Sequence, residues 1–186
     1  MLCHWLRTLA LGLFLLILAF LLIGLLLPTQ LRATISTQSG ASQTCLFRHI
    51  SQLDRWPLWT IWAQDFPDTV YLYEGKSGEV GSIERFSTPT QGSGSITLSS
   101  VQPESEVVYD LVMADWNYSL RGKLLIQGSE RLRNVIWVTQ SEPTQNPIYR
   151  WGNLIFAPML AKDMERSLER LNMACAHTTA ETPTPP

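Results

Sequence analysis

Aromatic side chains that carry a polar group are the residues of this chain best suited to chemistry at an apolar site. Three tryptophans lie within seven residues, at Trp56, Trp59 and Trp62, on both sides of Pro57. Each indole offers a large apolar area and one N–H donor, which suits the mouth of a hydrophobic cavity or a surface against lipid headgroups. In the alternative interpretation, the three rings fill one end of the core.

Further aromatic residues fall at alternating positions of predicted strands, so that each set lies on one face of its strand. If those faces point inward, the hydroxyl and indole N–H groups orient the hydroxyl or carbonyl of a bound ligand. Rings of this size also fill space within a sheet, and the sequence leaves the two roles open. The candidate ligand-binding residues on strands are Tyr71, Tyr73, Tyr109, Tyr118 and Trp137.

Sequence signatures of catalytic and metal sites are absent. The histidines, His4, His49 and His177, fall in predicted elements that do not bring two of them to one site. No G-x-S-x-G, H-E-x-x-H or phosphate-binding loop occurs. Asp110 and Arg121 interrupt apolar strands at positions where the side chain is expected to face solvent. The sequence therefore predicts no cofactor, no metal and no catalytic residue.

The charge balance excludes a nucleic-acid binder. The 186 residues include 14 Lys and Arg against 16 Asp and Glu, a net charge of −2, and no basic tract occurs. Nucleic-acid affinity depends on clustered Lys and Arg. Charged residues make up 16% of the chain, below the roughly 25% of ordinary soluble domains, and 45% of residues are hydrophobic.

Much of this apolarity lies in residues 9–27, where 17 of 19 residues are hydrophobic and none is charged. As a helix, this segment spans roughly 28 Å, close to the thickness of the hydrocarbon core of a bilayer. It is longer than the apolar part of a secretory signal, and no small-x-small cleavage site follows it closely. We therefore predict an uncleaved, single-pass membrane anchor.

The residues that flank the anchor predict its orientation. Arg7, the terminal amine and His4 precede it, whereas Arg32 is the only close basic residue after it. Because flanking Lys and Arg stay cytoplasmic, we expect residues 1–8 inside and the domain outside, with Pro28 ending the helix.

The remaining sequence predicts an α+β domain over residues 31–175. A strand at 31–38 is followed by a helix at 41–50 and a short helix at 53–56 that Pro57 stops. Short turns then connect six antiparallel strands, at 69–74, 82–87, 94–101, 106–113, 117–127 and 131–141. A long helix at 147–174, with a kink at Pro158, must cover the sheet. Residues 176–186 form a disordered tail rich in Pro and Thr.

The long helix carries an apolar stripe that is expected to pack on the sheet. The stripe comprises Trp151, Leu154, Ile155, Pro158, Met159, Met164, Leu168 and Leu171.

Four segments in this order resemble the polyketide cyclase/dehydrase branch of the START-like (SRPBCC) superfamily. They are LDRWPLWTIW (residues 53–62), YEGKSGEVGS (73–82), GSGSITL (92–98) and NPIYRWGNLIFAPMLAKDMERSLERL (146–171). The similarity covers about residues 31 to 173, and it matches membrane-anchored bacterial members that begin with one apolar helix. It implies a helix-grip fold, in which a curved seven-stranded sheet wraps the C-terminal helix around an elongated apolar cavity.

The resemblance adds Trp151 and Met159, on the long helix, to the expected cavity lining. It also places the helices after the first strand near the far end of the long helix, so that Cys45 and Cys175 are a candidate disulfide. The resemblance brings no defined catalytic residues. The alternative is that Cys45 and Cys175 are two small unpaired residues. Cys3 lies on the other side of the membrane and cannot join the pair.

The sequence thus predicts a domain anchored in a bacterial inner membrane, on its periplasmic side, that binds a hydrophobic small molecule or a lipid. The first alternative is a cyclase or hydratase acting on such a ligand, which requires an ionisable group such as Asp110 or His49 inside the cavity. The second is an envelope interaction protein with a collapsed cavity, which requires a packed interior and an exposed apolar patch.

Overall fold

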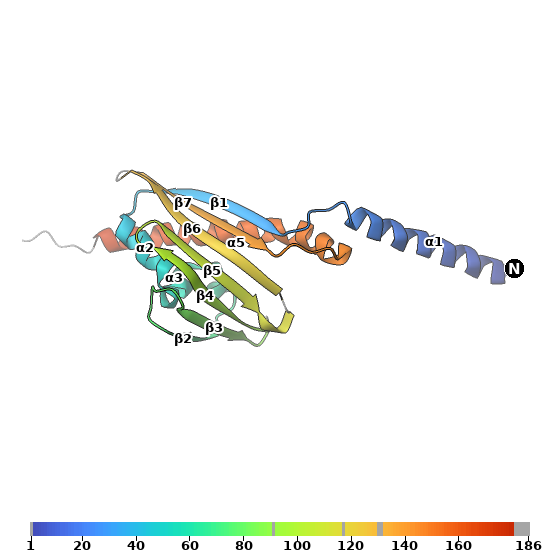
Figure 1. Ribbon diagram of the computed structural model, residues 1–186, viewed down its shortest axis with the longest axis horizontal. Coiled ribbons are helices and arrows are strands. Elements are labelled where there is room, and N and C mark those ends of the chain that lie inside the picture. The colour runs from blue at the N-terminus through green and yellow to red at the C-terminus, as the bar shows by residue number, and fades with distance from the viewer. Residues whose placement is uncertain (1, 91, 117, 130–131, 181–186) are drawn as a thin grey trace, which may run out of the picture.

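A single apolar helix projects from one end of the domain in the computed structural model (Figure 1). The structure describes all residues except 1, 91, 117, 130–131 and 181–186. The projecting helix, α1 (Leu2–Gly24), is long and apolar enough to span a membrane from Trp5 to Gly24. It ends three residues before the predicted Leu27, because Leu25 to Leu27 form a turn.

Seven antiparallel strands form one sheet, as predicted. In the order of the sheet they are β1 (Arg32–Ser39), β7 (Arg133–Ser141), β6 (Tyr118–Gly128), β5 (Glu106–Met113), β4 (Gly92–Gln102), β3 (Ile83–Thr88) and β2 (Val70–Glu74). The short helix η2 (Ala114–Trp116) connects β5 to β6. The strands run along the molecule, so that one end of the sheet lies toward α1 and the other lies away from it (Figure 1).

Four short helices lie between β1 and β2. They are α2 (Gln43–Ser51), η1 (Leu53–Arg55), α3 (Trp56–Trp59) and α4 (Ile61–Asp65). The prediction that Pro57 stops a helix was wrong, since Pro57 lies in the first turn of α3. Proline is tolerated there because the first turn needs no N–H from it.

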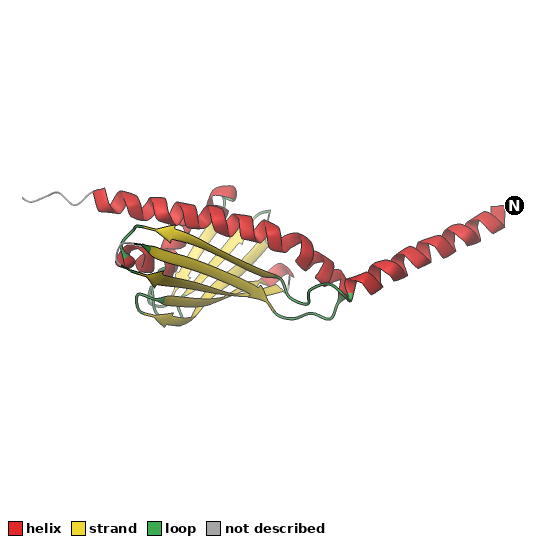
Figure 2. Ribbon diagram, turned by 90° about the horizontal axis from the view of Figure 1, so that it is seen from above, coloured by secondary structure: helices red, strands yellow, loops and turns green. Residues whose placement is uncertain are grey.

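The C-terminal helix α5 (Pro147–Ala180) runs along the β1 side of the sheet (Figure 2). It exceeds the predicted end at Ala174, and residues 181–186 of the predicted tail lie outside the described residues. Its second half packs on the core as predicted, through Met164, Leu168 and Leu171. In the first half, Leu154, Ile155 and Met159 are exposed, so the single apolar stripe was wrong there.

The strand registers define the concave face of the sheet, on which the short helices and α5 lie. Cross-strand partners share a face, so Tyr109, Gly122 and Thr139 form one row across β5, β6 and β7. The predicted alternation along each strand is confirmed. Glu84, Ile96, Leu111 and Leu120 form the next row toward α1. Tyr71, Phe86, Gly94, Met113 and Tyr118 form the row nearest to α1.

Candidate functional site

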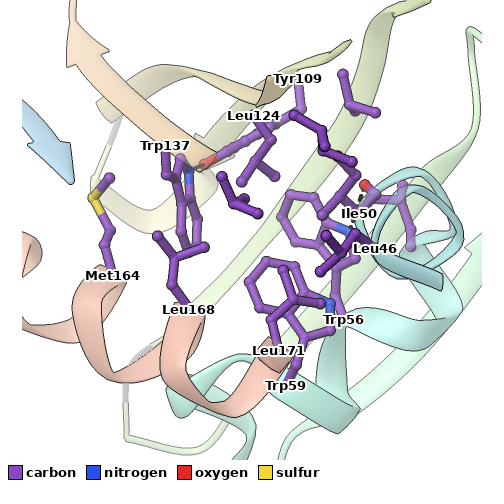
Figure 3. Close-up of a cluster of buried hydrophobic side chains, with 14 of the residues drawn as sticks. Leu46, Ile50, Trp56, Trp59, Tyr109, Leu124, Trp137, Met164, Leu168 and Leu171 are labelled. Atoms are coloured by element: carbon purple, nitrogen blue, oxygen red, sulfur yellow. Dashed lines mark hydrogen bonds between the residues drawn. The ribbon is translucent and has the colours of Figure 1, made fainter. Parts of the chain in front are cut away.

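Aromatic rings fill the part of the concave face that lies away from α1, and Figure 3 shows Trp56, Trp59, Tyr109 and Trp137 among its buried side chains. Trp56, Trp59 and Trp137 are at most 2% exposed and meet edge to face. The Trp56 ring lies 4.9 Å from that of Tyr109, and the half-buried Trp62 lies 5.9 Å from Trp137. We call these five residues the aromatic core.

The polar groups of Trp56, Trp59, Trp137 and Tyr109, four of the five residues of the aromatic core, have partners inside the protein. Trp56 Nε1 donates to the carbonyl oxygen of Ile50 and Trp59 Nε1 to that of His49, both at 3.1 Å. Trp137 Nε1 donates to the hydroxyl of Tyr109 at 2.9 Å. Because these groups are buried and satisfied, they are not available to orient a ligand.

The cavity implied by the family resemblance is therefore filled at this end of the sheet. Gly122 makes room for the filling, because a Cβ at this position would lie 1.9 Å from the Tyr109 ring. Two hollows in the described part of the chain lie elsewhere. One of about 440 Å³ is lined by Ser39, Gly40 and Asn172, and one of about 90 Å³ lies between η1 and the turn from β2 to β3.

The other end of the concave face, toward α1, is apolar and partly open. Its side chains are half-buried, in contrast with the aromatic core, and α5 lies to one side, over β1. We call this surface the open half. It comprises Tyr71, Phe86, Leu111, Met113, Tyr118 and Leu120. Of the predicted ligand-binding residues, Tyr71 and Tyr118 lie here, and Tyr73 lies at its border.

Glu84 is the one carboxyl-bearing residue, among the described residues, in the row of the concave face next to the aromatic core. It is 3% exposed, and its Oε2 atom has no hydrogen-bond partner among the described residues. Its cross-strand neighbour Tyr73 is 42% exposed and stacks on Tyr71, with ring centroids 6.4 Å apart. Sequence reasoning missed Glu84, and the only signal was its place two residues from Phe86 on the same strand.

Burial gives Glu84 an unusual ionisation. Desolvation raises the pKa of this carboxyl to about 8, against a hydrogen bond from Tyr73 that lowers it, and the nearby Asp54 raises it further. Burial also raises the pKa of Tyr71 and Tyr118. At neutral pH the Glu84 carboxyl is therefore largely protonated and can donate or release a proton.

A cyclase or hydratase would need Asp110 or His49 inside the cavity, and neither side chain lies on the open half of the concave face. Asp110 faces outward and pairs with Arg121 at 3.1 Å, which confirms that the two are solvated. His49 is buried, but its ring packs beside Cys45 and Cys175 instead of the open half. Burial lowers the pKa of His49, so the imidazole is neutral.

Cys45 and Cys175 lie together, as the family resemblance implied. Their sulfurs are bonded, their Cα atoms are 5.8 Å apart, and the bond joins α2 to the last part of α5. The Nδ1 atom of His49 lies 2.9 Å from the carbonyl oxygen of Cys45 and about 3.5 Å from the sulfurs. Sulfurs bonded to each other are not thiolates, so the three residues do not form a metal site in this state.

The start of α5 packs against the end of α1. Trp151 stacks on Phe20 with ring centroids 4.9 Å apart, and its Nε1 donates to the Phe20 carbonyl oxygen at 3.1 Å. The guanidinium of Arg150 donates to the carbonyl oxygen of Leu25. Trp151 therefore contacts α1, and Met159, 58% exposed, lies on the outer face of α5.

Comparison with known proteins supports the fold. No protein-family model matches the chain, and no curated protein matches it. The di-domain ARO/CYC StfQ from the steffimycin biosynthetic pathway is similar, with a TM-score of 0.62 and 8% identity over 82% of this chain and 52% of that chain. The chain therefore spans about half the length of StfQ.

Two further solved structures have the same arrangement. Truncated norcoclaurine synthase from Thalictrum flavum gives a TM-score of 0.56 with 12% identity, over 78% of this chain and 92% of that chain. A hypothetical protein from Helicobacter pylori gives 0.60 with 7% identity, over 77% and 87%. Identities this low show the fold alone, and the fold of this chain is the helix grip.

Proposed function

We propose that this chain is a membrane-anchored member of the START-like superfamily that binds a hydrophobic small molecule or a lipid on the open half of its concave face. The proposal places α1 across a bacterial inner membrane and the domain on the periplasmic side. The observation that carries it is the contrast between the closed aromatic core and the half-buried apolar side chains of the open half.

The position of the open half fits a ligand that partitions into the bilayer. Tyr118 begins β6 and Met113 ends β5, at the same end of the sheet as Arg32, which follows the connection from α1. A tethered apolar surface beside the membrane meets a high local concentration of such a ligand. The ligand would bury apolar area that the folded chain leaves partly in water.

The outer face of α5 supports the same location. Its first half exposes six large apolar residues, and no charged residue occurs between Arg150 and Lys162. We call these residues the α5 stripe: Ile148, Tyr149, Leu154, Ile155, Phe156 and Met159. Since the stripe begins where Trp151 contacts α1, it would lie at the bilayer surface, with its apolar side chains in the interface.

A matched pair of variants on β5 tests ligand binding. Met113→Lys places a charge on the open half, whereas Val112→Lys places it on the opposite face, where Val112 is already 44% exposed. In phosphatidylcholine nanodiscs, the wild-type chain and Val112→Lys should bind the uncharged probe N-phenyl-1-naphthylamine with equal affinity, and Met113→Lys should bind it about tenfold more weakly. Equal affinities for all three proteins would contradict the proposal.

A second candidate function, docking of another envelope protein, has its own support. The packed aromatic core and the exposed α5 stripe are the two features expected of a module with a collapsed cavity. In that case Ile155→Glu would abolish association with the partner, and Met113→Lys would leave it intact.

A further inference from the structure

We propose that Glu84 and Tyr73 form a binding site for the ammonium group of a cationic ligand, at the border between the open half and the hollow under the turn from β2 to β3. The inference rests on the proposed function, because the apolar part of the same ligand would lie on the open half. It adds the chemical class of the ligand.

The position of the Glu84 carboxyl carries this inference. Glu84 and Tyr73 are cross-strand partners on the concave face, and the Tyr73 hydroxyl is the hydrogen-bond partner of the carboxyl. The ring of Tyr73 also lines the 90 Å³ hollow, together with Asp54 and Ser82. The unpartnered Oε2 atom thus belongs to the cross-strand neighbour of a tyrosine that is 42% exposed and lines the hollow.

The surroundings of Glu84 hold acids and no counterion. Asp54, from η1, and Tyr73 and Tyr71, from β2, are the titratable groups that act on this site. The nearest basic residues of the β2–β3 hairpin are exposed and already paired, Arg85 with Glu74 and Lys76 with Glu79. Among the described residues, the carboxyl has no cation to neutralise it.

An ammonium group satisfies each of these features. Its N–H donates to the free Oε2 atom, its charge is attracted by Glu84 and Asp54, and the stacked rings of Tyr71 and Tyr73 offer their faces to a cation. A carboxylate or phosphate ligand would be repelled. Because the free carboxyl is largely protonated at neutral pH, binding of the cation displaces one proton from Glu84 to the buffer.

The test compares three probes that share one apolar chain: hexylammonium, 1-hexanol and hexanoate. Calorimetry uses the full chain in phosphatidylcholine nanodiscs, with empty nanodiscs subtracted, in phosphate and in HEPES buffers that differ in heat of ionisation. Hexylammonium should bind most tightly and release close to one proton at pH 7. Its affinity should rise about fiftyfold from pH 6 to pH 8, as the ionised fraction of a group with a pKa of about 8 does.

The Glu84→Gln variant keeps the shape of the side chain and removes its charge. It should bind hexylammonium at least about tenfold more weakly at pH 8, without proton release, and bind 1-hexanol unchanged. Glu79→Gln, at an exposed residue of the same hairpin, should behave as the wild type.

The remaining outcomes distinguish failure of the cation site alone from failure of the proposed function as well. Equal binding of 1-hexanol and hexylammonium by the wild type, or unchanged hexylammonium binding by Glu84→Gln, overturns the cation site and leaves hydrophobic binding intact. Failure of the wild type to bind any of the three probes overturns both the inference and the proposed function.

Discussion

At the scale of single residues, the Glu84 carboxyl is an unfavourable group for the folded domain. One of its oxygens is buried without a partner, and such a group costs about 1 to 3 kcal/mol relative to a satisfied one. Since this oxygen lowers the stability of the fold, we infer that Glu84 serves binding and not stability.

The raised pKa of Glu84 predicts a pH dependence of folding. An acid whose pKa rises to about 8 on folding destabilises the folded state increasingly as pH rises from about 4.5 to about 8, and no further above that. Glu84→Gln should remove this loss and stabilise the domain by roughly 3 kcal/mol at pH 7. Thermal unfolding in detergent at pH 5 and pH 8 measures the difference, and equal pH dependence of wild type and variant would contradict the assignment.

Gly122 predicts a second effect on stability. The Cβ of Gly122→Ala would overlap the Tyr109 ring and displace it from its bond with Trp137, so we expect a loss of about 2 kcal/mol or more. Gly152→Ala, in α5, is the control because its Cβ has only ordinary contacts at 3.7 Å. Denaturant unfolding followed by tryptophan fluorescence compares them, and equal midpoints would refute the tight packing of Tyr109.

The alternation of residues along strands predicts which face a side chain lies on, but not which other side chain it bonds to. Strand alternation placed Tyr109 and Trp137 on one face, but it could not show that their polar edges bond to each other across β6. It did not reveal Glu84 because Glu84 and Arg85 are both charged, so either one could face solvent.

At the scale of elements, the bond between α2 and α5 holds the far end of the helix grip. It closes a separation of 130 residues, for which chain entropy gives about 5 kcal/mol of stabilisation. Titration of the unfolded, unreduced chain should therefore find one reactive thiol, that of Cys3, and reduction should lower the unfolding midpoint. Three reactive thiols in protein isolated from membranes would contradict the bond and the oxidising compartment.

The α5 stripe predicts which part of the helix meets the bilayer. In a Cys3→Ser background, a spin label at Ile155→Cys should be accessible to oxygen and shielded from a water-soluble nickel chelate in vesicles. A label at Glu169→Cys, which is exposed and lies about 21 Å further along α5, should show the reverse. A label at Leu16→Cys reports whether α1 spans the bilayer.

The spin-label results at Ile155→Cys show whether lipid, a second copy of the chain or water covers the α5 stripe. Dipolar broadening between labels would show a second copy of the chain and favour the docking function. Full access to the nickel chelate, with Leu16 shielded, would show that α1 is in the membrane and the stripe is not.

The sequence was sufficient to predict the helices and strands themselves, but the predicted packing of α5 on the sheet was only partly right. The period of the apolar residues and the short turns predicted all seven strands and the long helix. At 3.6 residues per turn, the 13 residues between Ile155 and Leu168 turn the helix by about 220° beyond whole turns, so the two side chains lie on different faces of α5. The single stripe predicted for this helix overlooked that offset.

At the scale of the whole molecule, α1 projects from one end of the domain (Figure 1). The strand registers place the open half at the end of the sheet toward α1 and the closed aromatic core beyond it. Stability is concentrated in the aromatic core, where Trp59 and Trp137 are completely buried. The open half lies between this closed end and α1, so a ligand from the bilayer would reach it first if α1 spans a membrane as proposed.

Native mass spectrometry of the chain released gently from membranes tests this account most directly. We predict that the wild type and Val112→Lys carry one bound hydrophobic molecule and that Met113→Lys carries little or none. If all three proteins show only the mass of the bare chain, and none takes up an added hydrophobic probe, the claim that the open half is a ligand-binding surface is contradicted.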